Sequence, residues 1–253
     1  MPTSANGPQG TAPKGQKGQR TDPVAAMFGR IAPFYDLLNH SLSLGQDIFW
    51  RKRLVAAVAP PPGGLVMDLA AGTLDVTVAL CRRHPDLTVA ALDFARPMLA
   101  RGVARKITPA LAARVLPVQA DGRSLPLPDA CLDGATIAFG IRNIRPREAC
   151  YAKMLRCLKP GARFCILEFG TGQKRIWRGL YNLYLNRVLP GIGKLVSRDP
   201  KAYRYLADTI REFPAEDELA AELLDAGFKD VYHTPMTSGI VFLHVAQKDG
   251  GAQ

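Results

Sequence analysis

The chain has 253 residues, enough for one full hydrophobic core, and its 47% hydrophobic and 22% charged residues are ordinary for a globular protein. Five cysteines without a C-x-x-C pair and four scattered histidines predict reduced thiols and no metal site, and the lack of a signal-peptide core or membrane-length apolar run predicts a cytoplasmic protein. The net charge of +11, of which +9 follows residue 22, fits an anionic partner, either nucleic acid or an acidic membrane surface, or serves solubility alone.

The N-terminal part is expected to hold a disordered tail followed by cap helices. Residues 1–22 are rich in Gly, Pro and Gln without apolar periodicity, which predicts disorder. In residues 23–59, apolar side chains recur every three or four positions, which predicts two helices, separated near Leu44, that cover a ligand crevice. Tyr35 and Asp36, a polar pair at a predicted helix start, are candidates for substrate contact, while most aromatic residues nearby are expected only to pack.

The stretch that organises the predicted site is residues 65–78, LVMDLAAGTLDVTV. An apolar strand ends at Asp68, a turn of small residues includes Gly72, and a helix follows. Such a strand–turn–helix unit binds nucleotides in open α/β sheets. The dinucleotide fingerprint G-x-G-x-x-G is absent, because Ala70 and Asp75 stand at two of its glycine positions, and Asp75 would repel a phosphate. A nucleoside without phosphates, such as a cationic one, fits better.

Two further strand ends carry acids. Residues 88–92 form an apolar strand before Asp93, whose carboxylate could accept hydrogen bonds from a ribose diol and would flank the crevice with Asp68. A third strand is followed by Asp121 and Gly122, which could meet an adenine edge. An ordinary Asp-Gly turn explains that pair equally well.

The fourth predicted strand, residues 132–139, is expected to end over the reacting centre, since it lies in the middle of the sheet. The loop after it contains Arg142 and Asn143, polar residues that either act on a substrate or only stabilise the loop. A helix over residues 147–158 is expected to stop at a Lys-Pro-Gly turn, before the fifth strand.

A basic helical pattern rich in Trp and Tyr covers residues 174–196. Such a pattern occurs in helices that rest on an anionic membrane surface or wall a pocket for a greasy substrate, but a cap helix packed on the domain is its commoner explanation. Tyr203 follows close to the start of the next predicted helix.

Alternating strands and helices predict an α/β fold with a doubly wound, mostly parallel seven-stranded sheet and a helical cap. The last two strands, residues 231–234 and 240–247, are expected to close the sheet as an antiparallel pair. We expect a single domain over residues 23–248, with an inserted cap segment over residues 173–213 and a short tail over residues 249–253.

Several longer stretches of the chain resemble one enzyme family. They are FGRIAPFYDLLNHSLSLGQDIFWRK, DLAAGTLD, RVLPVQADGRSLPLPD, TIAFGIRNI, LKPGARFCILEFG and LPGIGKLVSRDPKAYRYLADTIREFP. Together they resemble the class I S-adenosylmethionine-dependent methyltransferases and, more narrowly, the C-methyltransferases of menaquinone and ubiquinone biosynthesis. The resemblance runs from about residue 28 to residue 248, and it implies S-adenosylmethionine as methyl donor and no metal.

The expected cofactor site consists of the first strand end, the turn after it and the positions that match the family's contacts: Asp68, Gly72, Thr73, Asp93, Asp121, Gly122 and Ala138. At Ala138 the family has a serine, so that contact is lost or made by the backbone alone. The family loop usually reads AGGTGD, so Ala71 and Leu74 replace glycines here. Leu74 fits if its side chain points into the helix–sheet packing, but a backbone angle that needs glycine would be strained.

The resemblance implies methylation of a ring carbon of a prenylated quinol such as demethylmenaquinol, with an ionised hydroxyl making the carbon nucleophilic. The candidate catalytic residues are Arg142, Asn143, Tyr35, Asp36 and Tyr203. Arg142 would stabilise the phenolate and Asn143 would orient a hydroxyl, while the other three are candidates for proton removal or ring placement. A long prenyl tail would remain in the bilayer, which implies a peripheral contact at the inner face of the membrane through residues 174–194.

Three alternatives remain beside this interpretation. Methylation of a 2-methoxy-6-polyprenyl-benzoquinol fits the same pattern. A nucleic-acid methyltransferase would suit the positive charge, but the chain has AFGI where amino methylation of bases usually uses an Asn/Asp-Pro-Pro-aromatic loop, so we expect no nucleic-acid partner. A non-catalytic binding protein of the same fold is the third, and Leu74 is its best support.

Overall fold

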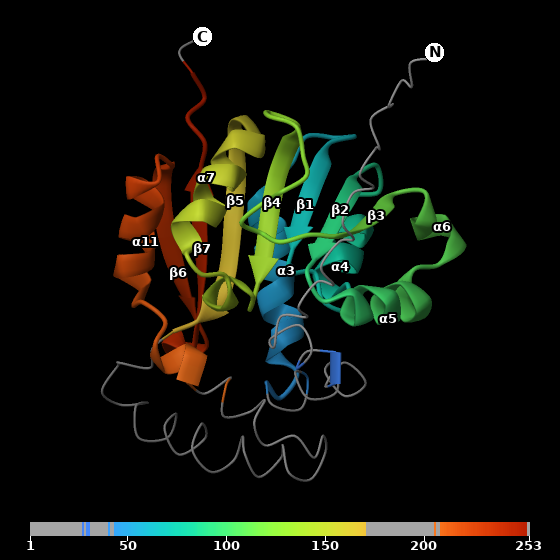
Figure 1. Ribbon diagram of the computed structural model, residues 1–253, viewed down its shortest axis with the longest axis horizontal. Coiled ribbons are helices and arrows are strands. Elements are labelled where there is room, and N and C mark those ends of the chain that lie inside the picture. The colour runs from blue at the N-terminus through green and yellow to red at the C-terminus, as the bar shows by residue number, and fades with distance from the viewer. Residues whose placement is uncertain are drawn as a thin grey trace, which may run out of the picture.

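The computed structural model describes residues 27, 29, 30, 40, 43–170, 205 and 208–251 (Figure 1). The predictions for the N-terminal tail, for Tyr35, Asp36 and Tyr203, and for the basic helix of residues 174–196 lie outside the described residues. The division of the chain into one domain with a cap stays a prediction.

Within the described residues, seven strands form one sheet in the order β3-β2-β1-β4-β5-β7-β6 (Figure 1). The strands are β1 (Leu65–Leu69), β2 (Thr88–Asp93), β3 (Val115–Gln119), β4 (Leu132–Ala138), β5 (Leu158–Phe169), β6 (Lys229–Met236) and β7 (Val241–Gln247). The first five strands pair in parallel, and β7 runs antiparallel to both β5 and β6. The strand order reverses between β1 and β4, which is where doubly wound sheets bind their ligands. The predicted fold class is confirmed.

Helices cover both faces of this sheet. One face carries α3 (Gln46–Val58), α4 (Asp75–Arg83) and α5 (Arg96–Lys106), and the other carries α7 (Arg147–Cys157) and α11 (Glu216–Asp225). The shorter elements are α6 (Pro109–Ala112), η1 (Ile141–Asn143) and η3 (Thr237–Gly239). Because both faces are covered, the parallel strands read as nearly continuous apolar runs, as expected of buried parallel sheets.

The pleat of β1 shows how one strand serves both layers. Met67 and Leu69 belong to the apolar cluster under α7, and Val66 belongs to the cluster under α3 and α4. Side chains two residues apart in a strand share a face, so Asp68 points to the same side as Val66. The one acid of β1 is thereby directed at α4.

The first described helix, α3, packs on the sheet itself. Trp50, Leu54 and Val55 are buried in the same apolar cluster as Cys165 and Leu167 of β5. This helix is therefore part of the layer over β4 and β5, and its N-terminal end reaches the edge of the sheet where β1 and β4 end (Figure 1).

The fifth strand begins earlier than predicted. β5 starts at Leu158, directly after α7, so the Lys-Pro-Gly turn expected to precede the strand lies inside it. Its pairing with β4 shifts register between Leu132 and Gly134, and Gly161 adopts a φ of 76°. The turn signal ended the helix as expected, but the strand accommodates the turn as an irregularity and continues.

All five cysteines are free, and four of them are buried: Cys81, Cys150, Cys157 and Cys165. No helix among the described residues is long and apolar enough to cross a membrane. In that same part of the chain, no group of three or more His, Cys, Asp and Glu side chains is placed to hold a metal ion.

Candidate active site

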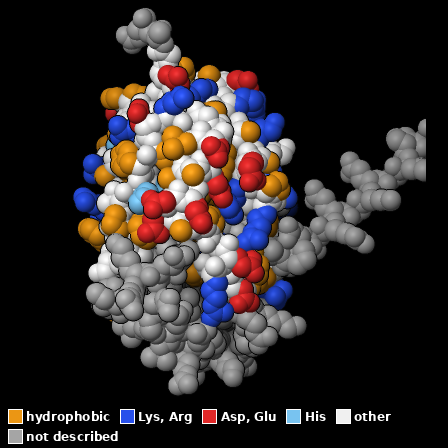
Figure 2. Space-filling view, turned by 90° about the vertical axis from the view of Figure 1, so that its left-hand side faces the viewer, with side chains coloured by type: hydrophobic (Ala, Val, Ile, Leu, Met, Phe, Trp, Pro, Cys, Tyr) orange, Lys and Arg blue, Asp and Glu red, His pale blue; other side chains and the backbone are white. Residues whose placement is uncertain are grey.

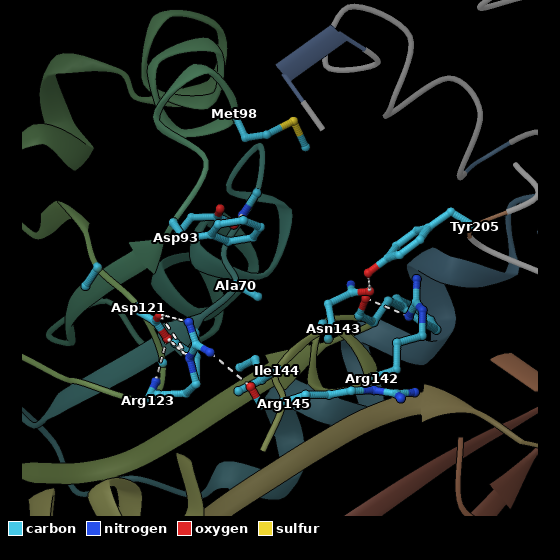
Figure 3. A pocket seen from close by; sticks show the side chains of 18 residues that line it. Ala70, Asp93, Met98, Asp121, Arg123, Arg142, Asn143, Ile144, Arg145 and Tyr205 are labelled. Atoms are coloured by element: carbon cyan, nitrogen blue, oxygen red, sulfur yellow. Dashed lines mark hydrogen bonds and ion pairs between the residues drawn. The ribbon is translucent and has the colours of Figure 1, made fainter. Parts of the chain in front are cut away.

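A pocket of about 310 Å³ lies at the carboxyl ends of β1 to β4 (Figure 3). It brings together seven of the residues expected from the sequence: Gly72, Asp93, Asp121, Gly122, Ala138, Arg142 and Asn143. Asp93 and Asp121 lie at one end of the pocket, and Asn143 and Tyr205 lie at the other (Figure 3). Asp68 and Thr73 are not among its lining residues.

Asp93 ends β2 and fixes the turn that follows β1. Its Oδ2 accepts a hydrogen bond from the backbone N–H of Gly72 at 2.8 Å, and its Oδ1 accepts one from the backbone N–H of Ala95 at 2.8 Å. Burial raises the pKa of this carboxyl, and the two backbone hydrogen bonds oppose the rise. Each carboxylate oxygen can accept a second hydrogen bond, so Asp93 can hold the loop and still receive the hydroxyls of a ribose.

The turn after β1 contains three residues with left-handed backbone angles. Ala70, Gly72 and Leu74 have φ values of 53°, 53° and 70°. The side chain of Leu74 is fully buried, and Gly102 of α5 makes room for it, because a Cβ at Gly102 would lie 2.6 Å from Cγ of Leu74. Both parts of the expectation for Leu74 hold: it points into the helix–sheet packing, and its backbone is strained by about 1–2 kcal/mol.

Asp68 lies beneath the turn and does not reach the pocket. Its Oδ2 accepts a hydrogen bond from Oγ1 of Thr77 at 2.6 Å, and its Oδ1 accepts one from Oγ1 of Thr136 at 3.1 Å. Complete burial raises the pKa of Asp68 to about 7. The expectation that Asp68 flanks the ligand crevice is corrected: the pleat of β1 turns it toward α4, where it joins β1 to α4 and β4.

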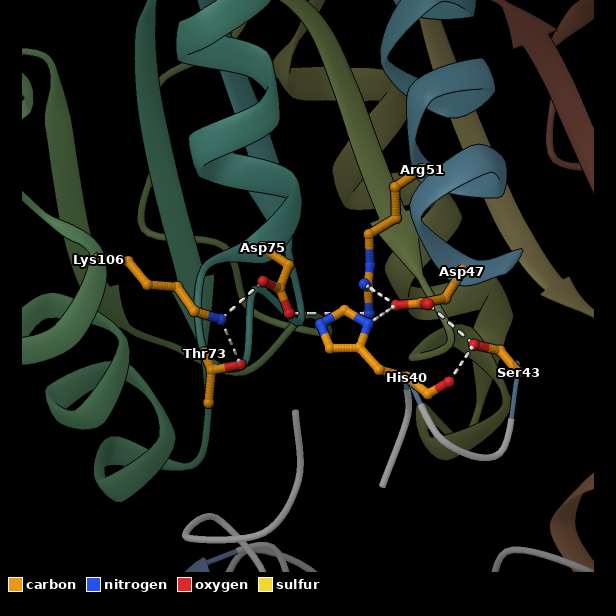
Figure 4. Close-up of polar contacts among 7 residues, drawn as sticks. All are labelled: His40, Ser43, Asp47, Arg51, Thr73, Asp75 and Lys106. Carbon is orange, nitrogen blue, oxygen red and sulfur yellow. Dashed lines mark hydrogen bonds and ion pairs between the residues drawn. The ribbon is translucent and has the colours of Figure 1, made fainter. Parts of the chain in front are cut away.

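Thr73 belongs to a chain of polar contacts beside the turn that follows β1 (Figure 4). Nζ of Lys106 donates to Oγ1 of Thr73 at 3.4 Å and to Oδ1 of Asp75 at 2.6 Å. Arg51 of α3 lies 3.8 Å from the other oxygen of Asp75 and also pairs with Asp47. The charge of Asp75 is therefore compensated by two cations, which removes the argument that it would repel a phosphate.

The same chain of contacts reaches the segment before α3. Asp47 is buried, accepts a hydrogen bond from Oγ of Ser43 at 2.8 Å, and lies 2.7 Å from Nδ1 of His40 (Figure 4). Burial raises the pKa of Asp47, but these partners and Arg51 outweigh it, so the pKa is lowered overall. The network ties α3, the turn after β1 and α5 to one another.

Asp121 is paired with a neighbouring cation. Nε and Nη2 of Arg123 donate to its carboxylate at 3.0 and 2.5 Å, and this pairing holds the pKa of Asp121 below its usual range. Nη1 of Arg123 also donates to the backbone carbonyl of Arg145 at 3.0 Å. Gly122 is packed so closely that a Cβ there would lie 2.8 Å from Cδ1 of Ile144. The loops after β3 and β4 thus meet at the pocket, and the adenine contact of Asp121 stays a prediction.

Arg142 is buried and paired with an acid that the sequence analysis missed. Its Nη1 donates to Oε1 of Glu168 at 2.6 Å and to the backbone carbonyl of Phe139 at 2.6 Å. Burial raises the pKa of Glu168, and the charge of Arg142 opposes the rise. Glu168 stands near the carboxyl end of β5, as Asp93 does on β2, and that position was the available signal. The contact of Arg142 with a phenolate stays a prediction, and the observed pairing fixes the loop after β4.

Asn143 is oriented by a tyrosine of the stretch that contains the predicted Tyr203. The hydroxyl of Tyr205 donates to Oδ1 of Asn143 at 3.1 Å, and both residues line the pocket. Because Oδ1 is engaged as an acceptor, the Nδ2 group is the end of the amide left to donate to a substrate oxygen. Tyr205 is a second residue missed by sequence reasoning, two positions from the residue that was chosen.

The lining suits a cationic nucleoside at one end and an aromatic acceptor at the other. Asp93 and Asp121 place two carboxylates in the lining, and the carboxylate of Asp93 can still accept hydrogen bonds from sugar hydroxyls. Phe139 and Ala138 continue the lining toward Asn143, and the ring of Phe139 lies 4.7 Å from that of Phe169. These donors and acceptors fit S-adenosylmethionine.

Comparison with known proteins agrees with this geometry. The chain matches the ubiE/COQ5 methyltransferase family over residues 14–248. It is 40% identical over 234 residues to a ubiquinone/menaquinone biosynthesis C-methyltransferase UbiE of Geobacter sulfurreducens, covering 92% of this chain and 90% of that protein. It is also 40% identical over 222 residues to a demethylmenaquinone methyltransferase of Thermus thermophilus, covering 88% of this chain and 100% of that protein.

Solved structures share the fold at low sequence identity. An S-adenosylmethionine-dependent methyltransferase from Aquifex aeolicus has a TM-score of 0.57 at 16% identity, covering 78% of this chain and 89% of that one. Phosphoethanolamine N-methyltransferase 2 of Haemonchus contortus has a TM-score of 0.58 at 14% identity, covering 78% and 52%. These similarities at low identity show the fold but not the family or the methyl acceptor, because one fold serves many functions. The family is shown by the sequence match. The chain belongs to the ubiE/COQ5 methyltransferase family.

Proposed function

We propose that the protein transfers a methyl group from S-adenosylmethionine to a ring carbon of a prenylated quinol, and that demethylmenaquinol is its substrate. The observation that carries the proposal is a single pocket with a carboxylate end at Asp93 and an oriented amide at Asn143, in a chain of this family. The names of the relatives support both a naphthoquinol and a benzoquinol acceptor. Membership of this family leaves the nucleic-acid alternative without support.

Bound S-adenosylmethionine supplies a methyl group on a positively charged sulfur. Asp93 would accept the hydrogen bonds of the ribose, and its two backbone contacts hold it in place before the ligand arrives. Gly72 lets the backbone approach the ligand, since its φ of 53° is readily adopted by glycine. The roles of Thr73, Asp121, Gly122 and Ala138 as cofactor contacts are part of the same proposal.

At the acceptor end, Asn143 would donate from Nδ2 to a quinol oxygen and so fix which ring carbon faces the methyl group. Arg142 would stabilise the phenolate that makes this carbon nucleophilic, with Glu168 holding its guanidinium. Tyr35, Asp36 and Tyr203 are proposed for proton removal or ring placement. Because the methyl group is already activated by the sulfonium, the proposed transfer needs no metal.

Calorimetry and product analysis test the proposal together. S-Adenosylmethionine should bind the purified protein, and Asp93→Ala should weaken binding at least about tenfold through loss of charged acceptors. Asn143→Ala should leave that binding unchanged but lower turnover of a reduced, short-chain demethylated naphthoquinol, followed by mass spectrometry, by about tenfold or more. The control is Leu224→Ser on the exposed side of α11, which should change neither binding nor turnover. Cofactor binding without methylation of either a naphthoquinol or a methoxybenzoquinol would contradict the proposal.

Testing Arg142 requires a paired variant. Arg142→Ala alone would leave Glu168 buried and uncompensated, which costs about 3–5 kcal/mol and would confound any loss of turnover. Arg142→Met combined with Glu168→Met removes both charges. If the double variant is folded and binds S-adenosylmethionine, its turnover should still fall strongly; unchanged turnover would exclude a role for Arg142 on the phenolate.

We also propose a transient membrane contact through residues 174–194, because a long prenyl tail remains in the bilayer. Replacing Arg175, Arg178 and Lys194 by Ala should reduce sedimentation of the protein with vesicles that contain anionic lipid. Equal sedimentation of this variant and the parent protein would count against the contact.

A further inference from the structure

The N-terminal end of α3 exposes a cluster of large apolar side chains. Leu44, Ile48 and Phe49 are 88%, 51% and 53% exposed, and they account for half of the six large exposed hydrophobic residues in the described part of the chain. Leaving such side chains in water forfeits the free energy that their burial would provide. Their gathering within six residues sets this surface apart from singly scattered apolar residues, which need no explanation.

Basic side chains follow the apolar cluster on the same face of the helix. Lys52 lies four residues after Ile48, and Arg53 lies four residues after Phe49, so each pair shares a face; all four are exposed. The guanidinium carbon of Arg53 is 5.9 Å from the centre of the Phe49 ring. At a rise of about 1.5 Å per residue, the basic side chains lie about 6 Å along the axis behind the apolar ones.

This spacing matches the layers of a bilayer interface. Apolar side chains that enter a membrane surface reach roughly 5–10 Å, to the boundary of headgroups and acyl chains. Cations about 6 Å behind them would then lie at the level of the lipid phosphates, where each contributes about 1 kcal/mol on anionic membranes. Charge complementarity therefore favours an anionic lipid surface over a neutral apolar partner.

The helix that carries the apolar cluster is packed firmly on the sheet, close to the pocket. The buried face of α3 packs into the core, and Nε1 of Trp50 donates to Oγ1 of Thr237 at 2.9 Å. The ring of Trp50 lies 6.1 Å from that of Phe139, which lines the pocket. The apolar cluster is thereby held at the same edge of the sheet as the pocket, where a substrate drawn from a bilayer would enter.

The opposite charge gathers elsewhere on the molecule. Figure 2 looks onto the side of α11 and β6, where Asp and Glu side chains gather, among them Glu216, Asp217 and Glu218 at the start of α11. An anionic membrane would repel that face. Orientation on a bilayer with α3 foremost keeps these acids off the lipid surface.

We propose that the turn before α3 and the exposed face of its first turns bind anionic lipid bilayers, with Leu44, Ile48 and Phe49 entering the headgroup region and Lys52 and Arg53 contacting lipid phosphates. The surface is distinct from residues 174–194, and its use in delivering a prenylated substrate rests on the proposed function. The lipid contact itself does not depend on the reaction.

Sedimentation with vesicles tests the lipid contact directly. The full chain should bind vesicles of phosphatidylcholine with phosphatidylglycerol, and Ile48→Ser with Phe49→Ser should weaken binding by about tenfold or more. Lys52→Ala with Arg53→Ala should weaken it by about thirtyfold at low salt and much less at high salt. The matched control is Leu224→Ser with Tyr232→Ser, two apolar residues that are each 51% exposed on the acidic side, and it should bind as the parent protein does.

The outcomes separate this surface from the proposed reaction. Methylation of a water-soluble, short-chain quinol should be unchanged in all three double variants, so a chain that binds vesicles but methylates no quinol would overturn only the reaction. Vesicle binding that is unaffected by both α3 variants would overturn the lipid surface while leaving the reaction intact. A parent protein that is dimeric by light scattering, with the α3 variants monomeric, would assign the cluster to a second copy of the chain and also overturn the proposal.

Discussion

Leu74 carries a large side chain at a backbone angle that favours glycine. Its φ is 70°, and its side chain is fully buried against the space left by Gly102. Two opposing effects follow: removing the side chain forfeits about 2–5 kcal/mol of packing, while glycine at a left-handed angle relieves about 1–2 kcal/mol of strain. The loss of packing exceeds the relief of strain, so Leu74 stabilises the turn in spite of its angle.

Urea unfolding of paired variants can separate packing from strain. Leu74→Gly and Leu74→Ala should both destabilise the fold, but Leu74→Gly should be the more stable of the two by about 1 kcal/mol. At Leu80, a buried residue inside α4, the order should reverse, with Gly below Ala by about 1 kcal/mol. The same order at both positions would show that the angle at Leu74 is not strained.

Asp68 should make the stability of the fold depend on pH. Its pKa is raised from the ordinary value of 3.8 to about 7 by burial, so the folded state disfavours its ionisation. The contribution of Asp68 is therefore fully present below about pH 4, is lost as pH rises toward 7, and is constant above that. We expect the unfolding free energy of Asp68→Asn, relative to the parent protein, to rise by on the order of 3 kcal/mol between pH 4 and pH 7. Parallel profiles in urea titrations would contradict this.

The residues that sequence reasoning located are those whose position in the chain fixes their position in space. Asp93 is the last residue of β2, and the last residues of parallel strands lie at the common edge of the sheet. Asp68 also stands in a strand, but the pleat directs it to the other side, which the sequence pattern did not resolve. The pairing of Arg142 with Glu168 and of Asn143 with Tyr205 joins segments 26 and 62 residues apart, and no local pattern encodes such partners.

At the scale of elements, the helices α3, α4 and α5 are joined by charges beside the turn that follows β1. Lys106 of α5 contacts Thr73 of the turn before α4 and Asp75 at the start of α4, and Arg51 of α3 approaches Asp75 from the other side (Figure 4). The side chains of Lys106 and Asp75 are 20% and 24% exposed, so the pair contributes little to stability after screening. Its main effect should be on where Thr73 and its turn are held.

Lys106→Met tests that role. We expect the unfolding free energy to fall by less than about 1 kcal/mol, while the Kd for S-adenosylmethionine rises about three- to tenfold because the turn is no longer fixed. Lys159→Met removes an ion pair to Asp133 at 2.7 Å that lies away from the pocket lining, and it should leave the Kd unchanged. Equal effects of both variants on the Kd would contradict a positioning role for Lys106.

The elements themselves were largely predictable, because each is short and bounded by a clear signal. The predicted strands of residues 88–92 and 132–139 match β2 and β4 to within one residue, and the predicted closing pair corresponds to β6 and β7. The prediction for β5 was wrong about where the strand begins. Leu158 pairs with Leu132 of β4, and this contact between distant segments extends the strand through the Lys-Pro-Gly turn. α6 was not predicted, since four residues show no helical period.

At the scale of the whole molecule, the two sides of the sheet differ in what they present. The α11 side carries acids, while the end of α3 carries apolar and basic side chains beside the pocket. The net charge of +11 suggested an anionic partner but could not say where that partner binds, because a net charge does not show where on the surface the charges lie. The distribution of the charges in space is the basis for our proposal that an anionic surface binds at the end of α3, and fold class alone would not have located this surface.

The buried cysteines are natural probes of when the helical layers detach from the sheet during unfolding. Cys81 of α4 and Cys165 of β5 lie in the apolar cluster between the sheet and the helices α3 and α4, Cys150 and Cys157 lie on the buried face of α7, and burial raises the pKa of Cys150 and Cys165 to about 12. A thiolate is the reactive form, so alkylation must wait until a layer detaches. Mass spectrometry of the alkylated peptides would therefore time the opening of each layer separately, without any introduced label, and show whether the two faces of the sheet come apart together.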